Sequence, residues 1–547
     1  MNGLMMDTPL LISAILEHAD LNHPNREIVS VTADEALHRY TYRECFQRVR
    51  KLANALDGLG LARGDRVATL AWNDYRHLEA YYAIGGAGYV CHTINPRLFA
   101  EQIVFIINHA EDRYVLTDPM FVPLLEKIAD QTPGVEGYVV MTSAAAMPAT
   151  SLKNAVCYED FIAGADAAYD WPELDEQAAV ALCYTSGTTG DPKGVLYSQR
   201  STVLHAYAGI APDVLNLSSR DCVLPVVPLF HVNAWGIPYS ALMVGSKLVF
   251  PGPKMGDGET LYNLMETERV SLSLGVPTVW LALLQYAEQN GKRLDSLERT
   301  VIGGAAVPES MIRAFRDDHD VVVHQGWGMT EMSPLGVLNS PKAGMESMSA
   351  DDMITLQTKA GRGLFGVEMR IVDDEQNELP WDGEAFGALQ VRGPWVCSDY
   401  FKLAGAAGTH TDDGWFDTGD VAKIDPEGYL QITDRTKDVI KSGGEWISSI
   451  DVENVAIGHP AVAEAAVIGV PHPKWTERPL LIVIRAEGKD VSREEMLAWF
   501  DGKIASWWLP DDVVFVDEIP HTATGKIKKI ELRQQFADHT LPTASDA

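Results

Sequence analysis

Short apolar, β-rich runs alternate with amphipathic helical stretches from about residue 64 to residue 326. Arg66–Leu70 and Lys247–Phe250 are strand-like, whereas Leu261–Glu268 and Thr278–Gln289 show the spacing of a helix with one apolar face. Strands that alternate with helices favour layers of helices packed on largely parallel sheets. The alternation therefore predicts an α/β architecture for this part of the chain.

The pattern changes after residue 361. Short strands and glycine-rich turns fill the stretch to about residue 434, which predicts a β-rich subdomain. From residue 451 a helical stretch near Val452–Ile457 precedes strand-like runs, so we expect a small α+β unit at the end of the chain. The last residues, Leu541–Ala547, are predicted to be disordered.

The charge balance excludes two broad classes of protein. With 76 acidic and 44 basic residues among 547, the formal net charge is −32, which argues against a nucleic-acid scaffold or attachment to anionic membranes through bulk charge. The length predicts two to four domains. Six scattered cysteines without metal-ligand spacing indicate neither a zinc site nor a disulfide framework, and no apolar run could span a bilayer. We therefore expect a cytoplasmic protein.

The strongest local signal is the loop YTSGTTGDPKGV at residues 184–195. It follows a strand-like run, and between Thr185 and Val195 it holds three glycines, four hydroxyl residues and one lysine. Such a loop can offer backbone N–H groups, hydroxyls and a cation to a polyphosphate, although it does not fit GxxxxGK[ST]. The alternative is a flexible surface turn. The GxGxxG match at 361–366 leads into a strand-like run, so it does not indicate a dinucleotide site.

The loop resembles the signature of the adenylate-forming superfamily, which includes acyl-CoA synthetases, luciferases and adenylation domains. Other segments resemble further superfamily motifs in the right order: GWGMTE at 326–331, TGD at 418–420, RTKD at 435–438 with IKSGGEW at 440–446, and PHTATGK at 520–526. Within the superfamily, PLFHVNAW at 228–235 and GVPTVW at 275–280 look most like bacterial medium- and long-chain fatty-acid–CoA ligases and methylmercaptopropionate–CoA ligases.

The resemblance implies a division of the chain. We expect a large N-terminal layered α/β adenylation domain at 1–434, with its β-rich subdomain at about 361–434. A hinge follows at 435–438, centred on Lys437, and a small mobile α+β lid domain occupies 439–547. In this superfamily the small domain rotates about the hinge between two half-reactions.

The implied chemistry needs cations rather than a protein nucleophile. A carboxylate attacks the α-phosphate of ATP to give an acyl-adenylate and pyrophosphate, so two anions must be brought together. The resemblance assigns Lys526, His231 and Glu331 to catalysis, with Lys526 bridging the carboxylate and the α-phosphate. Thr185 and Glu331 are the expected Mg²⁺ ligands, since Mg²⁺ prefers hard oxygen ligands. An isolated lysine would more often be solvated.

The resemblance also implies a nucleotide site, in which Asp420 and Arg435 bind the ribose. The expected ATP- or AMP-binding residues are Thr185, Ser186, Gly187, Thr188, Thr189, Gly190, Lys193, Gly303, Gly304, Ala305, Gln325, Gly326, Trp327, Thr330, Asp420, Ile432 and Arg435. Trp327 stands where tyrosine is commoner, so it is also expected to narrow the acyl pocket.

Two further sets complete the expected site. The acyl pocket is expected to contain His231, Trp235, Gly303, Trp327 and Pro334. His231 and Trp235 would share a face if their segment is helical, and a buried core pair is the alternative. The CoA path is expected to use Lys437, Ser442, Gly443, Gly444, Glu445 and Trp446.

These expectations converge on an ATP- and Mg²⁺-dependent acid–CoA ligase that forms an acyl-adenylate and then a thioester. Small to medium aliphatic acids such as 3-methylmercaptopropionate are the expected substrates, because two tryptophans frame the pocket. Long-chain acids, or an acyl-AMP ligase that serves a carrier protein, are alternatives. An oxygenase of the luciferase type and a non-catalytic binding protein are weaker ones. The resemblance also implies a homodimer.

Overall fold

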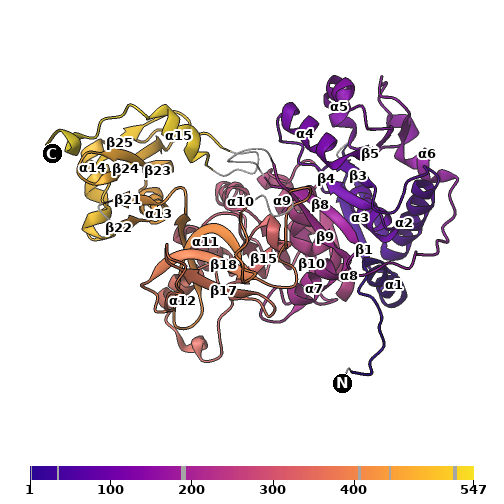
Figure 1. Ribbon diagram of the computed structural model, residues 1–547, viewed down its shortest axis with the longest axis horizontal. Coiled ribbons are helices and arrows are strands. Elements are labelled where there is room, and N and C mark those ends of the chain that lie inside the picture. Colours follow the sequence, from indigo (N-terminus) through magenta and orange to yellow (C-terminus); the bar gives the residue numbers. More distant parts are fainter. Residues whose placement is uncertain are drawn as a thin grey trace.

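The computed structural model describes residues 1, 3–33, 36–185, 192–403, 408–442, 445–521 and 527–546, with the backbone alone at 445–446 and 545–546. It contains a large α/β body and a smaller C-terminal sheet with its own helices, which lies to one side of that body (Figure 1). The predicted fold class is thereby confirmed. None of the helices formed by the described residues combines the length and apolar character needed to cross a bilayer.

The first sheet of the body has seven strands and is parallel except at one edge. Its spatial order is β7 (Ala155–Cys157), β6 (Gly137–Val140), β5 (Asp112–Thr117), β3 (Arg66–Leu70), β4 (Val90–Thr93), β8 (Ala179–Tyr184) and β9 (Gly194–Ser198). Strands β8 and β9 are antiparallel, with Tyr184 opposite Gly194. The loop that joins them is the phosphate-loop candidate, so it emerges at the carboxyl end of β8.

The second sheet has nine strands. Its order is β16 (Arg362–Gly363), β15 (Leu335–Leu338), β14 (Val322–Gly328), β13 (Arg299–Ile302), β12 (Leu272–Gly275), β10 (Cys222–Pro225), β11 (Lys247–Phe250), β1 (Glu27–Val31) and β2 (Leu37–Thr41). The strands from β14 to β1 pair in parallel, and antiparallel strands close both edges. This largely parallel pairing is what the βα alternation predicts.

Helices cover and separate these sheets. They are α1 (Ile12–Asn22), α2 (Tyr42–Asp57), α3 (Tyr75–Gly86), α4 (Ala100–Ala110), α5 (Val122–Ile128), α6 (Tyr158–Ala163), α7 (Gln199–Ile210), α8 (Ile237–Val244), α9 (Gly258–Glu268), α10 (Pro277–Gln289), α11 (Glu309–His319) and α12 (Ala350–Gln357). Every residue of α3 is buried, and Asp74 caps the helix by accepting a hydrogen bond from the N–H of His77. Helix α3 therefore belongs to the core rather than to the surface.

The predicted β-rich region forms a four-stranded antiparallel sheet. Its strands are β17 (Glu368–Val372), β18 (Phe386–Arg392), β19 (Phe416–Ile424) and β20 (Leu430–Arg435). Strand β17 follows the GxGxxG match at 361–366, as the sequence predicts for a match without a dinucleotide fold. The sheet brings Asp420 on β19 directly opposite Arg435 on β20.

In the described part of the C-terminal unit, a five-stranded sheet is accompanied by three α-helices. The strands are β21 (Ile440–Ser442), β22 (Glu445–Ile447), β23 (Val462–His472), β24 (Thr476–Arg485) and β25 (Asp512–Phe515), and the helices are α13 (Ser449–Ile457), α14 (Arg493–Trp499) and α15 (Lys529–Gln535). The prediction of disorder for Leu541–Ala547 is wrong for the described part of that segment. Leu541 is fully buried beside Ile519 and Leu532, because an apolar side chain at this point can fill the core.

Candidate functional site

A cavity of about 670 Å³ lies where the body, the β-rich sheet and the segment after β20 meet. Its lining includes many of the residues predicted from motifs that are far apart in sequence: Thr185, Lys193, His231, Trp235, Gly303, Gly304, Ala305, Gly326, Trp327, Thr330, Glu331, Pro334, Arg435 and Lys437. The carboxyl ends of parallel strands are the usual place for such a site. The fold thus gathers these residues around one space.

Of the predicted residues whose side chains the structure describes, four do not line this cavity. The Gln325 side chain accepts a hydrogen bond from the N–H of Val307 at 3.3 Å, and Ile432 packs against the apolar core. Ser442 is buried on β21, where its hydroxyl accepts a hydrogen bond from Arg478. Asp420 is 2% exposed, behind residues that do line the cavity.

Several predicted residues lie outside the described residues. They are Ser186, Gly187, Thr188, Thr189 and Gly190 of the phosphate loop, Gly443 and Gly444 of the CoA segment, and Lys526. For Glu445 and Trp446 only the backbone, in β22, is described. Their roles stay predictions.

The base of the phosphate loop is held closed by paired hydrogen bonds. The N–H of Thr185 donates to the carbonyl of Lys193 at 2.9 Å, and the N–H of Lys193 donates to the Thr185 hydroxyl at 3.1 Å. Both residues therefore stay at the edge of the cavity, at the point where the loop leaves and rejoins the sheet. One hydroxyl oxygen and one ammonium group are thereby placed beside the cavity.

Tyr400 connects the two charged groups at this end of the cavity. Its phenol donates a hydrogen bond of 2.7 Å to Oε1 of Glu331, and the Lys193 ammonium lies 4.8 Å from the centre of its ring. Burial and the Glu331 carboxylate raise the pKa of the Tyr400 phenol well above its usual value, so it stays a donor. The backbone of Thr330 is fixed separately, because its carbonyl accepts the hydroxyl of Tyr197 at 2.6 Å.

Asp420 has a different pair of partners. Its Oδ1 lies 2.8 Å from Nε of Arg435, and its Oδ2 accepts a hydrogen bond of 2.9 Å from Nε1 of Trp327. An ionised carboxylate has about four acceptor positions, so these two contacts leave acceptor capacity for further donors. Trp327, whose substitution for tyrosine stands out in the sequence, thus links β14 to the β-rich sheet through its indole N–H.

The segment between β10 and α8 does not have the helical spacing considered for His231 and Trp235. Val232, Asn233, Ala234 and Trp235 all have positive φ values between 46° and 56°, so the chain makes a left-handed turn here. L-residues rarely adopt this conformation in succession, because Cβ approaches the following carbonyl oxygen. Spacing of four residues therefore does not place His231 and Trp235 on one face of a right-handed helix.

The turn sets the Trp235 ring against the end of β13. A Cβ atom on Gly303 would lie 2.9 Å from Cη2 of Trp235 and 2.9 Å from the carbonyl oxygen of Gly326. Such distances leave no space for a side chain, so glycine is required where the indole meets the backbone. Val226 and Val279 contribute apolar side chains to the lining of the same cavity.

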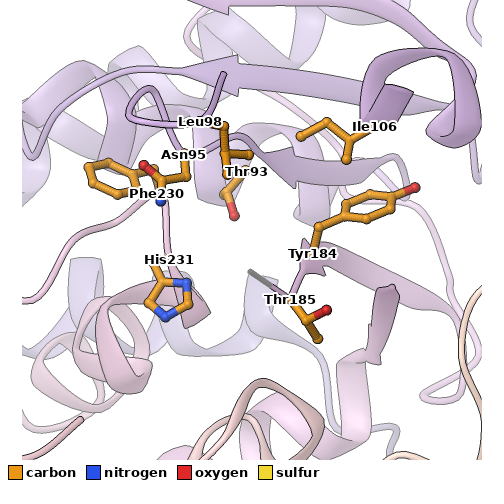
Figure 2. A pocket seen from close by; sticks show the side chains of 8 residues that line it. All are labelled: Thr93, Asn95, Leu98, Ile106, Tyr184, Thr185, Phe230 and His231. Carbon is orange, nitrogen blue, oxygen red and sulfur yellow. The ribbon is translucent and has the colours of Figure 1, made fainter. Parts of the chain in front are cut away.

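A smaller cavity adjoins the main one. Figure 2 shows its lining residues, and Thr185 and His231, which also line the main cavity, lie across from Thr93. The remaining lining side chains are Asn95, Leu98, Ile106, Tyr184 and Phe230. His231 therefore stands at the junction of the two spaces.

Tyr400 and Arg97 are among the residues lining the main cavity that sequence reasoning missed. The guanidinium of Arg97 lies 5.6 Å from the ring centre of Trp72 and 6.0 Å from that of Phe230, and burial lowers its pKa. Neither residue belongs to the quoted motifs. A lone tyrosine in a β-rich stretch and a lone arginine before a helix carry no local signal of their roles.

Comparison with protein families agrees with this site. A model of AMP-binding enzymes matches residues 16–401, and a model of the AMP-binding enzyme C-terminal domain matches residues 451–526. The chain belongs to the AMP-binding enzyme family. The resemblance to the adenylate-forming superfamily is thereby confirmed.

Curated members of this family match over nearly their whole length. A 3-methylmercaptopropionyl-CoA ligase of Ruegeria lacuscaerulensis is 53% identical over 538 residues, which are 98% of this chain and 99% of the relative. A medium-chain-fatty-acid–CoA ligase of Ectopseudomonas oleovorans is 50% identical over 545 residues, covering 100% of this chain and 99% of the relative.

Solved structures of AMP-binding enzymes show the same architecture. The anthranilate CoA ligase AuaEII in complex with anthranoyl-AMP aligns with a TM-score of 0.85 at 26% identity, covering 97% of this chain and 98% of that one. ATP-bound MatB from Rhodopseudomonas palustris aligns with a TM-score of 0.81 at 26% identity, covering 96% and 99% of the two chains.

Proposed function

We propose that this AMP-binding enzyme is an acid–CoA ligase that forms AMP: ATP activates a carboxylic acid as an acyl-adenylate, and CoA then accepts the acyl group as a thioester. The observation that carries the proposal is the cavity itself. Lys193, Glu331 and Arg435 contribute charged groups to its lining, and Val226 and Val279 contribute apolar side chains. The charged groups suit a nucleotide, and the apolar side chains suit an aliphatic chain.

In the first half-reaction a carboxylate oxygen bonds to the α-phosphorus of ATP, and the bond from that phosphorus to the bridging oxygen of pyrophosphate breaks. The carboxylate and the triphosphate repel each other, so the protein must supply positive charge and oriented donors. Lys193 and Arg435 line the cavity for this purpose, and Lys526 is the proposed bridge between the two reacting groups. Asp420 and Arg435 are proposed to hold the ribose.

The donor set at Glu331 suits a divalent cation of the Mg²⁺ type. The Glu331 carboxylate and the Thr185 hydroxyl both line the cavity, and both are hard oxygen donors. No group of three or more His, Cys, Asp or Glu side chains gathered for a metal occurs among the described residues, which fits an ion held largely by phosphates. Mg²⁺ would neutralise phosphate charge, while Tyr400 holds the Glu331 carboxylate in place.

For the second half-reaction we propose that the C-terminal unit turns about residues 435–438, which separate an N-terminal domain at 1–434 from a lid at 439–547. The chain makes a turn here, in which the N–H groups of Asp438 and Val439 both donate to the carbonyl of Arg435. Arg533 of α15 pairs with Asp438 at 2.7 Å. Lys437 and the segment 442–446 would then border the CoA arm.

Small to medium aliphatic acids, with 3-methylmercaptopropionate as the specific candidate, are the proposed substrates. Trp235 and Trp327 both line the cavity and limit its width. The relative from Ruegeria lacuscaerulensis carries the name of a ligase for that acid. The relative from Ectopseudomonas oleovorans keeps medium-chain acids as the second candidate. We further propose a cytoplasmic homodimer.

The test is pyrophosphate release across straight-chain acids of graded length and 3-methylmercaptopropionate, with and without CoA. We expect release that requires both acid and ATP, and AMP and thioester formation only when CoA is added. An optimum at long-chain acids would overturn the substrate assignment. Acyl transfer to a carrier protein without transfer to free CoA would overturn the ligase assignment.

The Lys526→Ala variant tests the proposed bridge. It should lose adenylate formation while it still converts a supplied acyl-AMP to the thioester, because the second step does not join two anions at phosphorus. Lys528→Ala is the matched control, since Lys528 forms an exposed ion pair with Glu531. Equal loss of both half-reactions in the Lys526 variant would contradict the assignment.

A further inference from the structure

Two buried side chains fix the backbone of one residue in the cavity wall, Leu335. Leu335 follows Pro334, and both line the cavity. The N–H of Leu335 donates to Nε2 of His205 at 3.1 Å, and its carbonyl accepts a hydrogen bond of 3.1 Å from Nε1 of Trp395. His205 is 3% exposed and Trp395 4% exposed, so bulk water does not compete for either hydrogen bond. These two buried side chains therefore hold the Leu335 backbone in place from outside the cavity.

His205 also touches a second segment, the one that carries Trp235 of the lining. Gly236 directly follows Trp235 and has a φ of +78°. A Cβ atom on Gly236 would lie 2.7 Å from Nδ1 and 2.8 Å from Cε1 of His205. The imidazole thus packs against the backbone that carries the Trp235 indole, while its other nitrogen holds Leu335. A single ring therefore contacts both segments.

The His205 imidazole has one protonation state and one orientation, which suits a structural role. Nε2 accepts the Leu335 N–H, so the ring carries its proton on Nδ1 and is neutral. Burial lowers the pKa of His205 to about 4, which keeps the ring uncharged at neutral pH. The ring of Trp395 meets it edge to face, with centroids 6.0 Å apart. Ring packing therefore fixes the orientation of both hydrogen-bonding groups.

We propose that His205 and Trp395 are positioning residues that set the width of the acid pocket and thereby its selectivity among acids. They act through the wall at Pro334 and Leu335 and through the turn that carries Trp235. This inference rests on the proposed function, because it assumes that an acid occupies the cavity that these segments line.

The experiment compares two substitutions of His205. Gln retains an acceptor that can meet the Leu335 N–H, whereas Leu retains volume but offers no acceptor. We expect His205→Leu to change the ratio of kcat/KM between short and medium-chain acids by about tenfold, with the KM for ATP within about twofold of the wild type. His205→Gln should restore most of the wild-type ratio.

A chemically matched control is His319→Leu. His319 is also buried and also accepts a backbone N–H, from Leu294 at 3.4 Å, yet it lies on α11 and its partner Leu294 does not line the cavity. A loss of stability alone would lower activity toward all acids alike in both variants. An unchanged acid ratio in His205→Leu would overturn the inference.

Trp395→Phe provides a second test of the proposal if His205→Leu does not fold. This variant retains a ring but removes the donor to the Leu335 carbonyl, and we expect a shift in the same acid ratio. An unchanged acid ratio in a folded Trp395→Phe variant would also overturn the inference. Failure of the proposed function would look different, because the wild-type protein itself would then release no pyrophosphate with any acid.

Discussion

The phenol of Tyr400 donates a hydrogen bond of 2.7 Å to the Glu331 carboxylate across 69 residues of sequence. The same ring faces the Lys193 ammonium, so one side chain holds an anionic and a cationic group of the proposed phosphate site in place. Hydrogen bonds to charged groups are among the stronger ones in proteins, and here the partner is the proposed ligand of Mg²⁺. The orientation of Glu331 therefore depends on a residue outside its own motif.

Tyr400→Phe should lower kcat for adenylate formation by about tenfold and raise the Mg²⁺ concentration needed for half-maximal rate, because the Glu331 carboxylate loses its orienting donor. Pyrophosphate release at graded Mg²⁺ measures both effects. Tyr82→Phe is the matched control, since its hydroxyl donates to the backbone carbonyl of Pro238, away from the cavity lining. Equal responses of the two variants would contradict a special role for Tyr400.

Gly303→Ala should reduce kcat/KM for the acid by at least about tenfold and destabilise the fold by about 1–3 kcal/mol, because the added methyl group meets both Trp235 and the backbone of Gly326. Steady-state kinetics and chemical denaturation provide the two measurements. At Gly256 a Cβ atom would meet nothing within 4 Å, so Gly256→Ala is the control. A fully active Gly303→Ala enzyme would show that Trp235 is not held against β13.

Lys437→Pro should spare adenylate formation and abolish thioester formation, because proline fixes φ at the position about which the C-terminal unit is proposed to turn. Single-turnover assays of each half-reaction, the second with supplied acyl-AMP, separate the effects. Lys437→Ala removes the same side chain without restricting the backbone. Thioester formation at the wild-type rate in the proline variant would argue against rotation at this residue.

The contribution of two buried histidines to stability should fall as the pH drops from 7.5 to 5. Burial lowers the pKa of both His77 and His205 to about 4, below the ordinary value of 6.5. Between these pH values the two histidines bind protons in the unfolded chain but not in the folded protein. Their contribution to the free energy of unfolding is therefore fully present above about pH 6.5 and decreases below it. Each histidine contributes a loss of about 2 kcal/mol by pH 5.

Chemical denaturation at the two pH values measures this loss. His205→Gln removes one titrating group, so its loss of stability should be smaller than that of the wild type by about 2 kcal/mol. The exposed His18 gives the control variant His18→Gln, for which we expect the wild-type loss. An unchanged pH dependence in His205→Gln would contradict the effect of burial.

Much of the fold was predictable because the elements are locally encoded. Lys247–Phe250 coincides with β11, and the helical stretch Thr278–Gln289 begins one residue inside α10. Leu541 shows where local reasoning fails. This apolar residue begins a short, mostly polar tail, which predicts disorder, but its side chain is buried in the core of the C-terminal unit. Tertiary packing decided that segment rather than local propensity.

The candidate site was likewise predictable only in part from the sequence. Motif residues such as Thr185, Glu331 and Arg435 meet at one cavity, as the resemblance implies. Tyr400 could not be found, because its role depends on a hydrogen bond between distant segments. The backbone at Trp235 could not be found either, since the four residues with positive φ that precede Gly236 are not glycines.

That turn has a consequence for how such enzymes diversify. Four successive residues from Val232 to Trp235 hold positive φ without glycine, a conformation that disfavours each of them by roughly 1 kcal/mol or more. Substitutions that relax this strain can move the Trp235 indole without altering the groups that handle phosphate. Acid preference can therefore drift through small changes in one surface of the cavity, while the machinery for activating carboxylates is inherited unchanged.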